Sequence, residues 1–176
     1  PTAVIPLYGR SADNIRDHRH VTSLLHRIET TDTGVLVTPT LSFDERGHQV
    51  NHMTYYCVGW SGNGEKPVDF YPTAEDFVGE GGNFERPYAI VKNAEGVKAG
   101  TKIEGLEAVG GLHFSEITLE PEEECSYLIF TGITEDIQEI RNLSKTYTTR
   151  EKVLEELEKT KAYWQEKVNV AYHTGD

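Results

Sequence analysis

The amino-acid sequence predicts a mainly β protein, an antiparallel β-sandwich followed by C-terminal helices. Strand-like segments separated by turn residues run from about residue 20 to residue 132. Helical periodicity is almost absent before residue 134, whereas apolar residues recur at helical spacing after it. We therefore divide the chain into a sandwich domain, residues 1–133, and a helical linker, residues 134–176.

Alternating apolar residues predict the strands. Val35, Val37 and Leu41 alternate with polar neighbours, and "TTDTG" and "DERG" are turn sequences, which gives strands at about 20–28, 34–43 and 48–60. Residues 61–87 are rich in Gly and Pro and predict a long loop packed by its own aromatic residues. Strand signals return in "YAIVKN", "LEAVGGLHFSEITLE" and "CSYLIFTGI", with "PEEE" as the turn between the last two.

Two helices are expected after residue 134. "TEDIQEIRNL" predicts a short helix with Ile137, Ile140 and Leu143 on one face. "TTREKVLEELEKTKAYWQEKV" predicts a second helix that starts near Thr149 and has an apolar stripe containing Trp164. Such a stripe needs a surface to cover.

Composition excludes several classes of function. With 29 acidic and 17 basic residues and a net charge of −12, the chain of 176 residues lacks the basic surface that nucleic acids require. No apolar run approaches the roughly 18 residues of a membrane-spanning helix. Cys57 and Cys125 are expected to be buried free thiols, which suits the cytoplasm, and no secretory leader is apparent. The chain begins at Pro1 and stops soon after a strong helix, so we expect it to be a piece of a larger protein.

The charged opening stretch, "PLYGRSADNIRDHRH", allows three interpretations. Its Arg and Asp side chains suit recognition of sugar hydroxyls, carboxylates or phosphates, which is the interpretation that we favour. A solvated charged loop is the main alternative. A metal site at His18 and His20 is the third, but zinc would need further ligands that nothing in the sequence predicts, so we expect no metal.

No catalytic motif stands out. "GWSGNGEKP" has neither the ending of a phosphate-binding loop nor the spacing of a nucleophile elbow. Asp69, Asp76 and Glu80 could be combined into a carboxylate pair, but surface acids are the simpler interpretation. Trp60, beside a Gly-rich turn, could stack on a sugar ring, as could Phe70 and Tyr71, and for all three we favour packing.

Several segments together resemble one protein family. They are "PLYGRSADNIRDHRHVTSLLHRI", "TPTLSFDERGH", "FYPTAEDFVGEGGNFERP", "LEAVGGLHFSEITLEPEEECSYLIFTGI" and "LEKTKAYWQEKV". In this order they resemble the N-terminal region of bacterial inverting glycoside phosphorylases of the cellobiose phosphorylase family. The nearest resemblance is to the 1,2-β-oligoglucan phosphorylases and to the C-terminal regions of cyclic β-1,2-glucan synthases.

The resemblance implies a galactose mutarotase-like sandwich, here incomplete, that linker helices join to an (α/α)6 barrel. In that family the barrel holds the general acid and the phosphate site, so the resemblance implies no catalytic residue in this chain. It also implies a homodimer, phosphate as co-substrate, a β-glucan oligosaccharide as substrate, and no cofactor. The expected substrate or interface contacts are Arg10, Asp13, Arg16, His18, Trp60 and Glu80.

Two functions from different classes follow. The first is a non-catalytic portion of a glycoside phosphorylase that supports the barrel and shapes its sugar site or the dimer interface. The alternative is a free-standing carbohydrate-binding β-sandwich. The C-terminal helix favours the first, because an autonomous module would have little use for a Trp-bearing amphipathic helix after its last strand.

Overall fold

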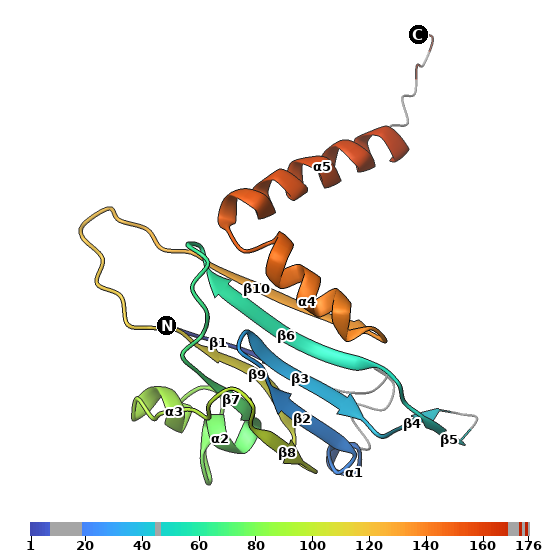
Figure 1. Cartoon of the computed structure of the whole chain (residues 1–176), viewed down its shortest axis with the longest axis vertical. Helices are drawn as coiled ribbons and strands as arrows, with labels where there is room; N and C mark the ends of the chain where they lie inside the picture. Colours follow the sequence, from blue (N-terminus) through green and yellow to red (C-terminus); the bar gives the residue numbers. More distant parts are fainter. Residues whose placement is uncertain (8–18, 45–46, 169–172, 174, 176) are drawn as a thin grey trace.

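The computed structural model describes residues 1–7, 19–44, 47–168, 173 and 175. Within these residues the strands form two larger antiparallel sheets and a hairpin (Figure 1). The five-stranded sheet has the order β10 (Tyr127–Thr134), β6 (Thr54–Ser61), β3 (Gly34–Pro39), β2 (His26–Thr30) and β8 (Lys102–Glu104). The three-stranded sheet has the order β1 (Thr2–Pro6), β9 (Ala108–His113) and β7 (Asp69–Thr73), and the hairpin pairs β4 (Leu41–Asp44) with β5 (Gly47–Val50). The predicted mainly β fold with antiparallel sheets is confirmed.

The main hydrophobic core lies between the two larger sheets. Val35, Val37 and Cys57 of the five-stranded sheet are completely buried and belong to the same cluster as Phe70 and Leu112 of the three-stranded sheet. Val35 and Val37 are two residues apart, so their side chains project to the same face of β3. Burial of apolar area between the sheets therefore stabilises the sandwich.

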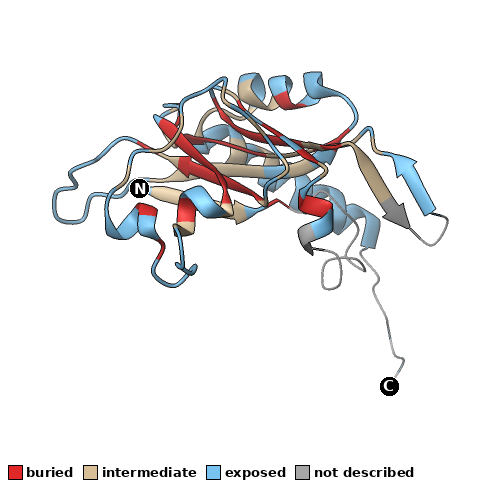
Figure 2. Ribbon diagram, turned by 90° about the horizontal axis from the view of Figure 1, so that it is seen from below, coloured by how far each residue is buried: buried red, intermediate tan, exposed pale blue. Residues whose placement is uncertain are grey.

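Helices cover the outer face of each sheet. Ile140 of α4 (Ile137–Thr146) packs on the five-stranded sheet in one cluster with Leu36, Val58 and Trp60. Figure 2 shows the buried residues concentrated in the strands, with exposed residues on the outer sides of the helices. Because both faces of this sheet are covered, β3 is almost continuously buried along its length.

Two short helices cover the other sheet. Phe77 of α2 (Ala74–Val78) and Ala89 of α3 (Tyr88–Val91) pack with Tyr71 and Val109. The sheets are thus sandwiched between α4 on one side and the α2–α3 pair on the other (Figure 1). The described residues therefore form one apolar cluster between the sheets and one under the helices on each outer face.

One glycine shows how closely strands approach each other. A Cβ atom at Gly34 would lie 2.0 Å from the carbonyl oxygen of Cys57 on the neighbouring strand β6. That separation is far below van der Waals contact and the obstacle is backbone, so a side chain could not be accommodated without moving a strand.

The last helix differs from the rest of the molecule. α5 (Arg150–Val168) has no buried residue and leads away from the sandwich (Figure 1). Its Leu157, Trp164 and Val168 are 45%, 56% and 61% exposed. The two predicted helices are present, the second starting within one residue of the predicted Thr149, but the apolar stripe of the second has no partner in the part of the chain that the structure describes.

Three predicted strands have different boundaries. The strand expected at 20–28 is α1 (Arg19–Ser23) followed by β2, the one at 34–43 is divided into β3 and β4, and the one at 48–60 is divided into β5 and β6. Thr40 separates β3 from β4, and its backbone N–H donates to the carbonyl of Leu25, just before β2.

Three other segments were predicted wrongly. "YAIVKN" forms α3 and not a strand, because Pro87 with its φ of −67° starts a helical turn and Ala89 packs against α2. The expected strand "LEAVGGLHFSEITLE" ends at His113, and residues 114–126 form one long loop, exposed over residues 115–125, where a tight turn was predicted. The long loop expected at 61–87 contains β7 and α2. The strands β1 and β8 were not predicted at all.

Candidate functional site

Most of the predicted contact residues lie in the opening stretch. Arg10, Asp13, Arg16 and His18 all fall outside the residues that the structure describes. The proposed role of this stretch therefore stays a prediction. Glu80 is described, and it lies exposed just after α2.

The three aromatic residues weighed as sugar platforms are all buried. Trp60 is 1% exposed and meets Phe130 edge to face, with 5.4 Å between the ring centroids. Phe70 and Tyr71 are each 2% exposed. These positions agree with packing, which the sequence favoured over stacking on a sugar ring.

The acids weighed as a carboxylate pair have separate local partners. Asp69, the first residue of β7, is buried and not a surface acid, and its carboxylate is 2.8 Å from Nδ1 of His113 on the adjacent strand β9. Asp76 accepts a hydrogen bond of 2.7 Å from the Thr73 hydroxyl at the start of α2. Both contacts are structural: the first joins two strands and the second belongs to a helix cap.

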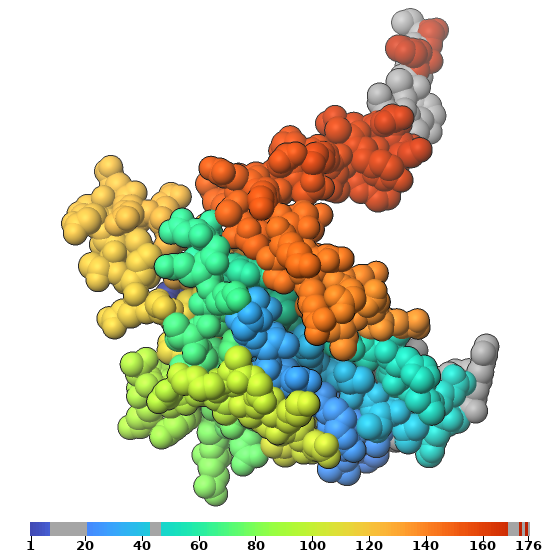
Figure 3. Space-filling view, viewed as in Figure 1, coloured from blue at the N-terminus to red at the C-terminus, as the bar shows by residue number. Residues whose placement is uncertain are grey.

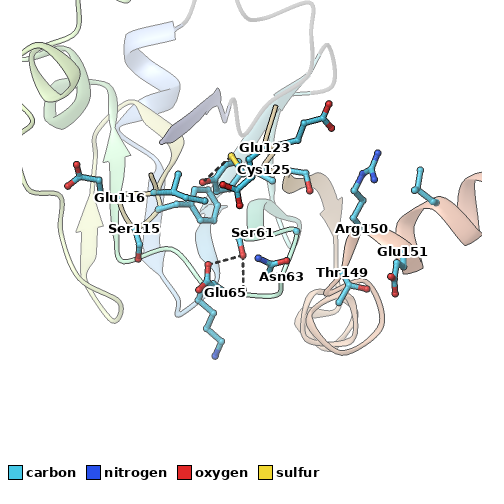
Figure 4. Close-up of a pocket in the computed structure, with 18 residues that line it drawn as sticks. Ser61, Asn63, Glu65, Ser115, Glu116, Glu123, Cys125, Thr149, Arg150 and Glu151 are labelled. Carbon is cyan, nitrogen blue, oxygen red and sulfur yellow. Dashed lines mark hydrogen bonds between the residues drawn. The ribbon is translucent and has the colours of Figure 1, made fainter. Parts of the chain in front are cut away.

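A cavity among the described residues lies at one end of the sandwich, and Figure 4 shows the residues that line it. It has a volume of about 690 Å³ and is formed by three segments that are distant in sequence. These are the turn 61–66 after β6, the loop 114–127 between β9 and β10, and residues 149–154 at the start of α5. We call it the end cavity.

Backbone hydrogen bonds hold these three segments together. The N–H of Gly62 donates to the carbonyl of Ser126 at 2.6 Å, which joins the turn to the end of the loop. The N–H of Arg150 donates to the carbonyl of Gly62 at 3.4 Å, which joins α5 to the same turn. Within the turn, Ser61 Oγ donates to the Glu65 carboxylate at 3.2 Å and accepts from the Glu65 N–H at 3.1 Å.

An aromatic pair packs beneath the loop. The rings of Phe114 and Tyr127 lie 4.6 Å apart between centroids, and Phe114 is only 3% exposed. The Cys125 thiol is 3.9 Å from the hydroxyl of Tyr127. Partial burial, with a smaller contribution from Cys125, raises the pKa of Tyr127, so this phenol remains a neutral hydrogen-bonding group at physiological pH.

Cys125 corrects one of the expectations from sequence. We expected both thiols to be buried, and this holds for Cys57 but not for Cys125, which is exposed. The strand β10 begins at Tyr127, so Cys125 belongs to the loop and not to a strand whose side chains alternate into a core. Both cysteines are free thiols.

The charge around the end cavity is mostly negative. Its lining contains the carboxylates Glu65, Glu116, Glu123, Glu124 and Glu151, against the cations Lys66 and Arg150. Lys66 is bonded to Asp32 in the β2–β3 turn. Figure 4 shows Ser61 and Asn63 in the middle of the labelled lining residues, with Ser115 and Glu116 to the left and Thr149, Arg150 and Glu151 to the right.

Sequence reasoning missed this cavity. The only local signal was the polar run "SEITLEPEEECS", which is longer than a hairpin turn requires. Nothing local indicates that the loop approaches the turn 61–66 or the start of α5. Among the described residues, no three His, Cys, Asp or Glu side chains come close enough together to hold a metal ion.

Comparisons with known proteins bear on the identity of the chain. A search of the curated proteins found no match. No helix in the described part of the chain has the length and apolar character needed to cross a membrane. The model of one protein family, described as glycosyl hydrolase 94, supersandwich domain, matches residues 9–150. This match runs from the opening stretch through all strands of both larger sheets except β1, and through α4, to the first residue of α5, so the chain belongs to the glycosyl hydrolase 94 family, as its supersandwich domain.

Proposed function

We propose that this chain is the non-catalytic sandwich portion of a glycoside phosphorylase that converts a β-glucan oligosaccharide and phosphate to glucose 1-phosphate. In this proposal the chain supports a C-terminal catalytic barrel, helps to shape its sugar site or a homodimer interface, and works in the cytoplasm. Membership of the glycosyl hydrolase 94 family supports action on glycosides. The resemblance to 1,2-β-oligoglucan phosphorylases supports phosphate as co-substrate and β-1,2-linked glucans as substrates.

One structural observation carries the proposal. After α4 closes the outer face of the sandwich, the chain continues into a helix of 19 residues that buries no side chain. Exposed Leu157, Trp164 and Val168 on one helix are expected to be covered by another surface. A second domain that follows the sandwich would supply that surface.

The reaction proposed for the longer protein is a single displacement. Phosphate attacks the anomeric carbon of the terminal glucose while a carboxylic acid protonates the departing glycosidic oxygen. The bond from the anomeric carbon to the glycosidic oxygen breaks, a bond to phosphate oxygen forms, and the configuration at that carbon is inverted. Phosphate is already anionic, so no second carboxylate is needed to activate the nucleophile. In this proposal both reacting groups bind outside the present chain.

The test compares this chain with the longer protein that contains it. We expect phosphate-dependent release of glucose 1-phosphate from β-1,2-linked oligoglucans by the longer protein, and none by the 176 residues alone. Release by the 176-residue chain would place a catalytic acid within it, and single Asp69→Asn, Asp76→Asn and Glu80→Gln variants would locate that acid. A parent protein with no helical domain after Asp176 would favour the free-standing binding module instead.

The opening stretch provides a second test in the longer protein. If Arg10 and Asp13 contact sugar or a subunit interface, Arg10→Ala and Asp13→Ala should each reduce kcat/KM or dimerisation at unchanged melting temperature. Loss of a desolvated polar contact costs about 1–3 kcal/mol. Arg86→Ala, at an exposed arginine in the loop before α3, is the matched control. Unchanged kinetics and unchanged oligomeric state in both variants would identify the stretch as a solvated loop.

A further inference from the structure

We propose that the end cavity binds a neutral oligosaccharide. The choice of a carbohydrate among neutral polar ligands rests on the proposed function, whereas the location, the polarity and the exclusion of anions rest on the geometry of the cavity.

The cavity has the size of a small-molecule site, and two backbone hydrogen bonds at Gly62 join the segments that line it. Its volume of about 690 Å³ is within the range of about 300–1,000 Å³ that is typical of ligand pockets. The turn is tied to the loop through Gly62 and Ser126, and to α5 through Gly62 and Arg150. A site built in this way needs little ordering when a ligand binds, which favours affinity.

The lining combines the two kinds of group that sugar rings require. Asn63 and Thr149 carry groups that both donate and accept hydrogen bonds, as sugar hydroxyls do. Ser61 Oγ donates its hydrogen to Glu65 and accepts from the Glu65 N–H, so it keeps one lone pair that can accept from a ligand. Ile117 and Leu154 line the same cavity and are 45% and 43% exposed, so they offer apolar surface to the C–H faces of a ring. A uniformly apolar ligand would leave the polar groups unpaired, at a cost in affinity.

Charge decides between neutral and anionic ligands. Carboxylates of Glu116, Glu123 and Glu151 belong to the lining, and the ammonium group of Lys66 is bonded to Asp32. Arg150 can still donate to a hydroxyl, but one guanidinium among several carboxylates would not hold a phosphate. The end cavity is therefore suited to a neutral sugar chain and not to phosphate or a sugar phosphate. The alternative that its charge allows is a basic peptide.

The experiment is an NMR titration of the 176-residue chain. The neutral probes are the glucose trisaccharides with β-1,2, β-1,4 and α-1,4 linkages, the anionic probes are inorganic phosphate and glucose 1-phosphate, and the cationic probe is tetralysine. We expect at least one trisaccharide to shift the amide signals of residues 61–66, 114–127 and 149–154 in a saturable way. The phosphates should leave these signals unchanged.

Two variants, with one control, test whether the trisaccharide binds in the end cavity. Arg150→Ala should weaken the trisaccharide about tenfold or more, because a hydrogen bond from a charged group contributes about 1.5–3 kcal/mol. Lys152→Ala is the matched control: it removes a cation of the same helix that does not line the cavity, and affinity should be unchanged. Ser115→Trp, at an exposed loop position of the lining, should obstruct the cavity and weaken binding while the melting temperature stays the same.

Several results would overturn the proposal. The proposal is wrong if none of the three trisaccharides gives a saturable shift, or if the shifts are confined to residues outside the three segments. It is also wrong if phosphate binds as tightly as the trisaccharides. Tetralysine shifting the same signals in place of the sugars would assign the cavity to a basic peptide instead.

The proposed function is tested separately by phosphorolysis in the longer protein. A trisaccharide bound in the end cavity, with no phosphorolysis by the longer protein, would reject the phosphorylase and keep the sugar site. Phosphorolysis by the longer protein, with no sugar bound to the 176-residue chain, would keep the phosphorylase and reject the sugar site.

Discussion

The two helices that follow the last strand have opposite relations to the sandwich. α4 packs Ile140 on the five-stranded sheet, where this residue is 5% exposed, whereas α5 has no buried residue. Figure 3 shows α4 lying on the body of the molecule and α5 extending beyond it. Apolar residues recur at helical spacing in both helices, although α4 is much the more amphipathic of the two. Such spacing indicates the need for an apolar partner surface without indicating where that surface lies.

The two tryptophans express this difference most directly. Trp60 is 1% exposed beneath α4, and Trp164 is 56% exposed on α5. Trp60→Ala should destabilise the chain by about 3–5 kcal/mol, because it removes a large buried ring and leaves a cavity between β6 and α4. Urea unfolding followed by circular dichroism measures this loss. A loss below about 1 kcal/mol would mean that α4 does not close over this face.

Removing the anchor of α4 should have the next largest effect. Ile140→Ala is expected to cost about 2–3 kcal/mol, the lower part of the usual range for a buried isoleucine, because its cluster lies on one face of the sheet only. The matched change on the other helix is Leu157→Ala, at a residue that is 45% exposed, and it should cost far less. Equal losses in the two variants would remove the distinction between the helices.

The pH dependence of stability distinguishes the cysteine in the core, Cys57, from the cysteine in the exposed loop, Cys125. Burial raises the pKa of the Cys57 thiol from 9.0 to about 12. Between these values the unfolded chain releases a proton that the native chain retains, so stability falls as pH rises, by about 1.4 kcal/mol per pH unit. Below pH 9 both states hold the proton, and this contribution to stability is fully present.

Unfolding free energies at pH 8, 9, 10 and 11 provide the measurement. Cys57→Ala should have a shallower decline than the wild-type chain above pH 9, whereas Cys125→Ala, at an exposed thiol, should follow the wild type. Parallel curves for wild type and Cys57→Ala would show that Cys57 ionises equally in both states.

Substitutions at the first residue before α4 test how much the capping of this helix contributes to stability. The Asp136 carboxylate accepts a hydrogen bond of 2.8 Å from the N–H of Gln138 and caps the helix. Asp136→Ala should cost about 1 kcal/mol, and Asp136→Asn, which keeps an accepting oxygen, only a few tenths. Thermal melts distinguish the two variants. An equal cost for both would assign the effect to the charge of Asp136 and not to its cap.

The smallest effect is expected on α5. Trp164→Ala should change the stability of the 176-residue chain by no more than about 0.5 kcal/mol, since the ring contacts mainly its neighbour Tyr163 at 5.4 Å between centroids. The same substitution in the longer protein should lower the melting temperature, if a second domain covers α5. A loss comparable to that of Trp60→Ala in the short chain would show that α5 folds back onto the sandwich.

Local patterns determined the fold class and both C-terminal helices. Alternation around Val35 and Val37 indicated strands because successive side chains of a strand point to opposite faces. Ile137, Ile140 and Leu143 indicated a helix because residues three apart share a face, although Ile137 proved to be 43% exposed. Local patterns failed for α3, where Pro87 and packing against α2 outweighed the β-branched residues of "YAIV".

Only the tertiary structure decided which faces are covered and which residues meet. Trp60 and Trp164 were both expected to be covered by other residues, yet one lies under a helix and the other is exposed. The end cavity brings residues 61–66, 114–127 and 149–154 together through backbone bonds at Gly62 that no local pattern encodes. The physical reason is that backbone geometry sets the period of a helix or strand within a few residues, whereas the partner of an apolar face depends on contacts between segments far apart in the chain.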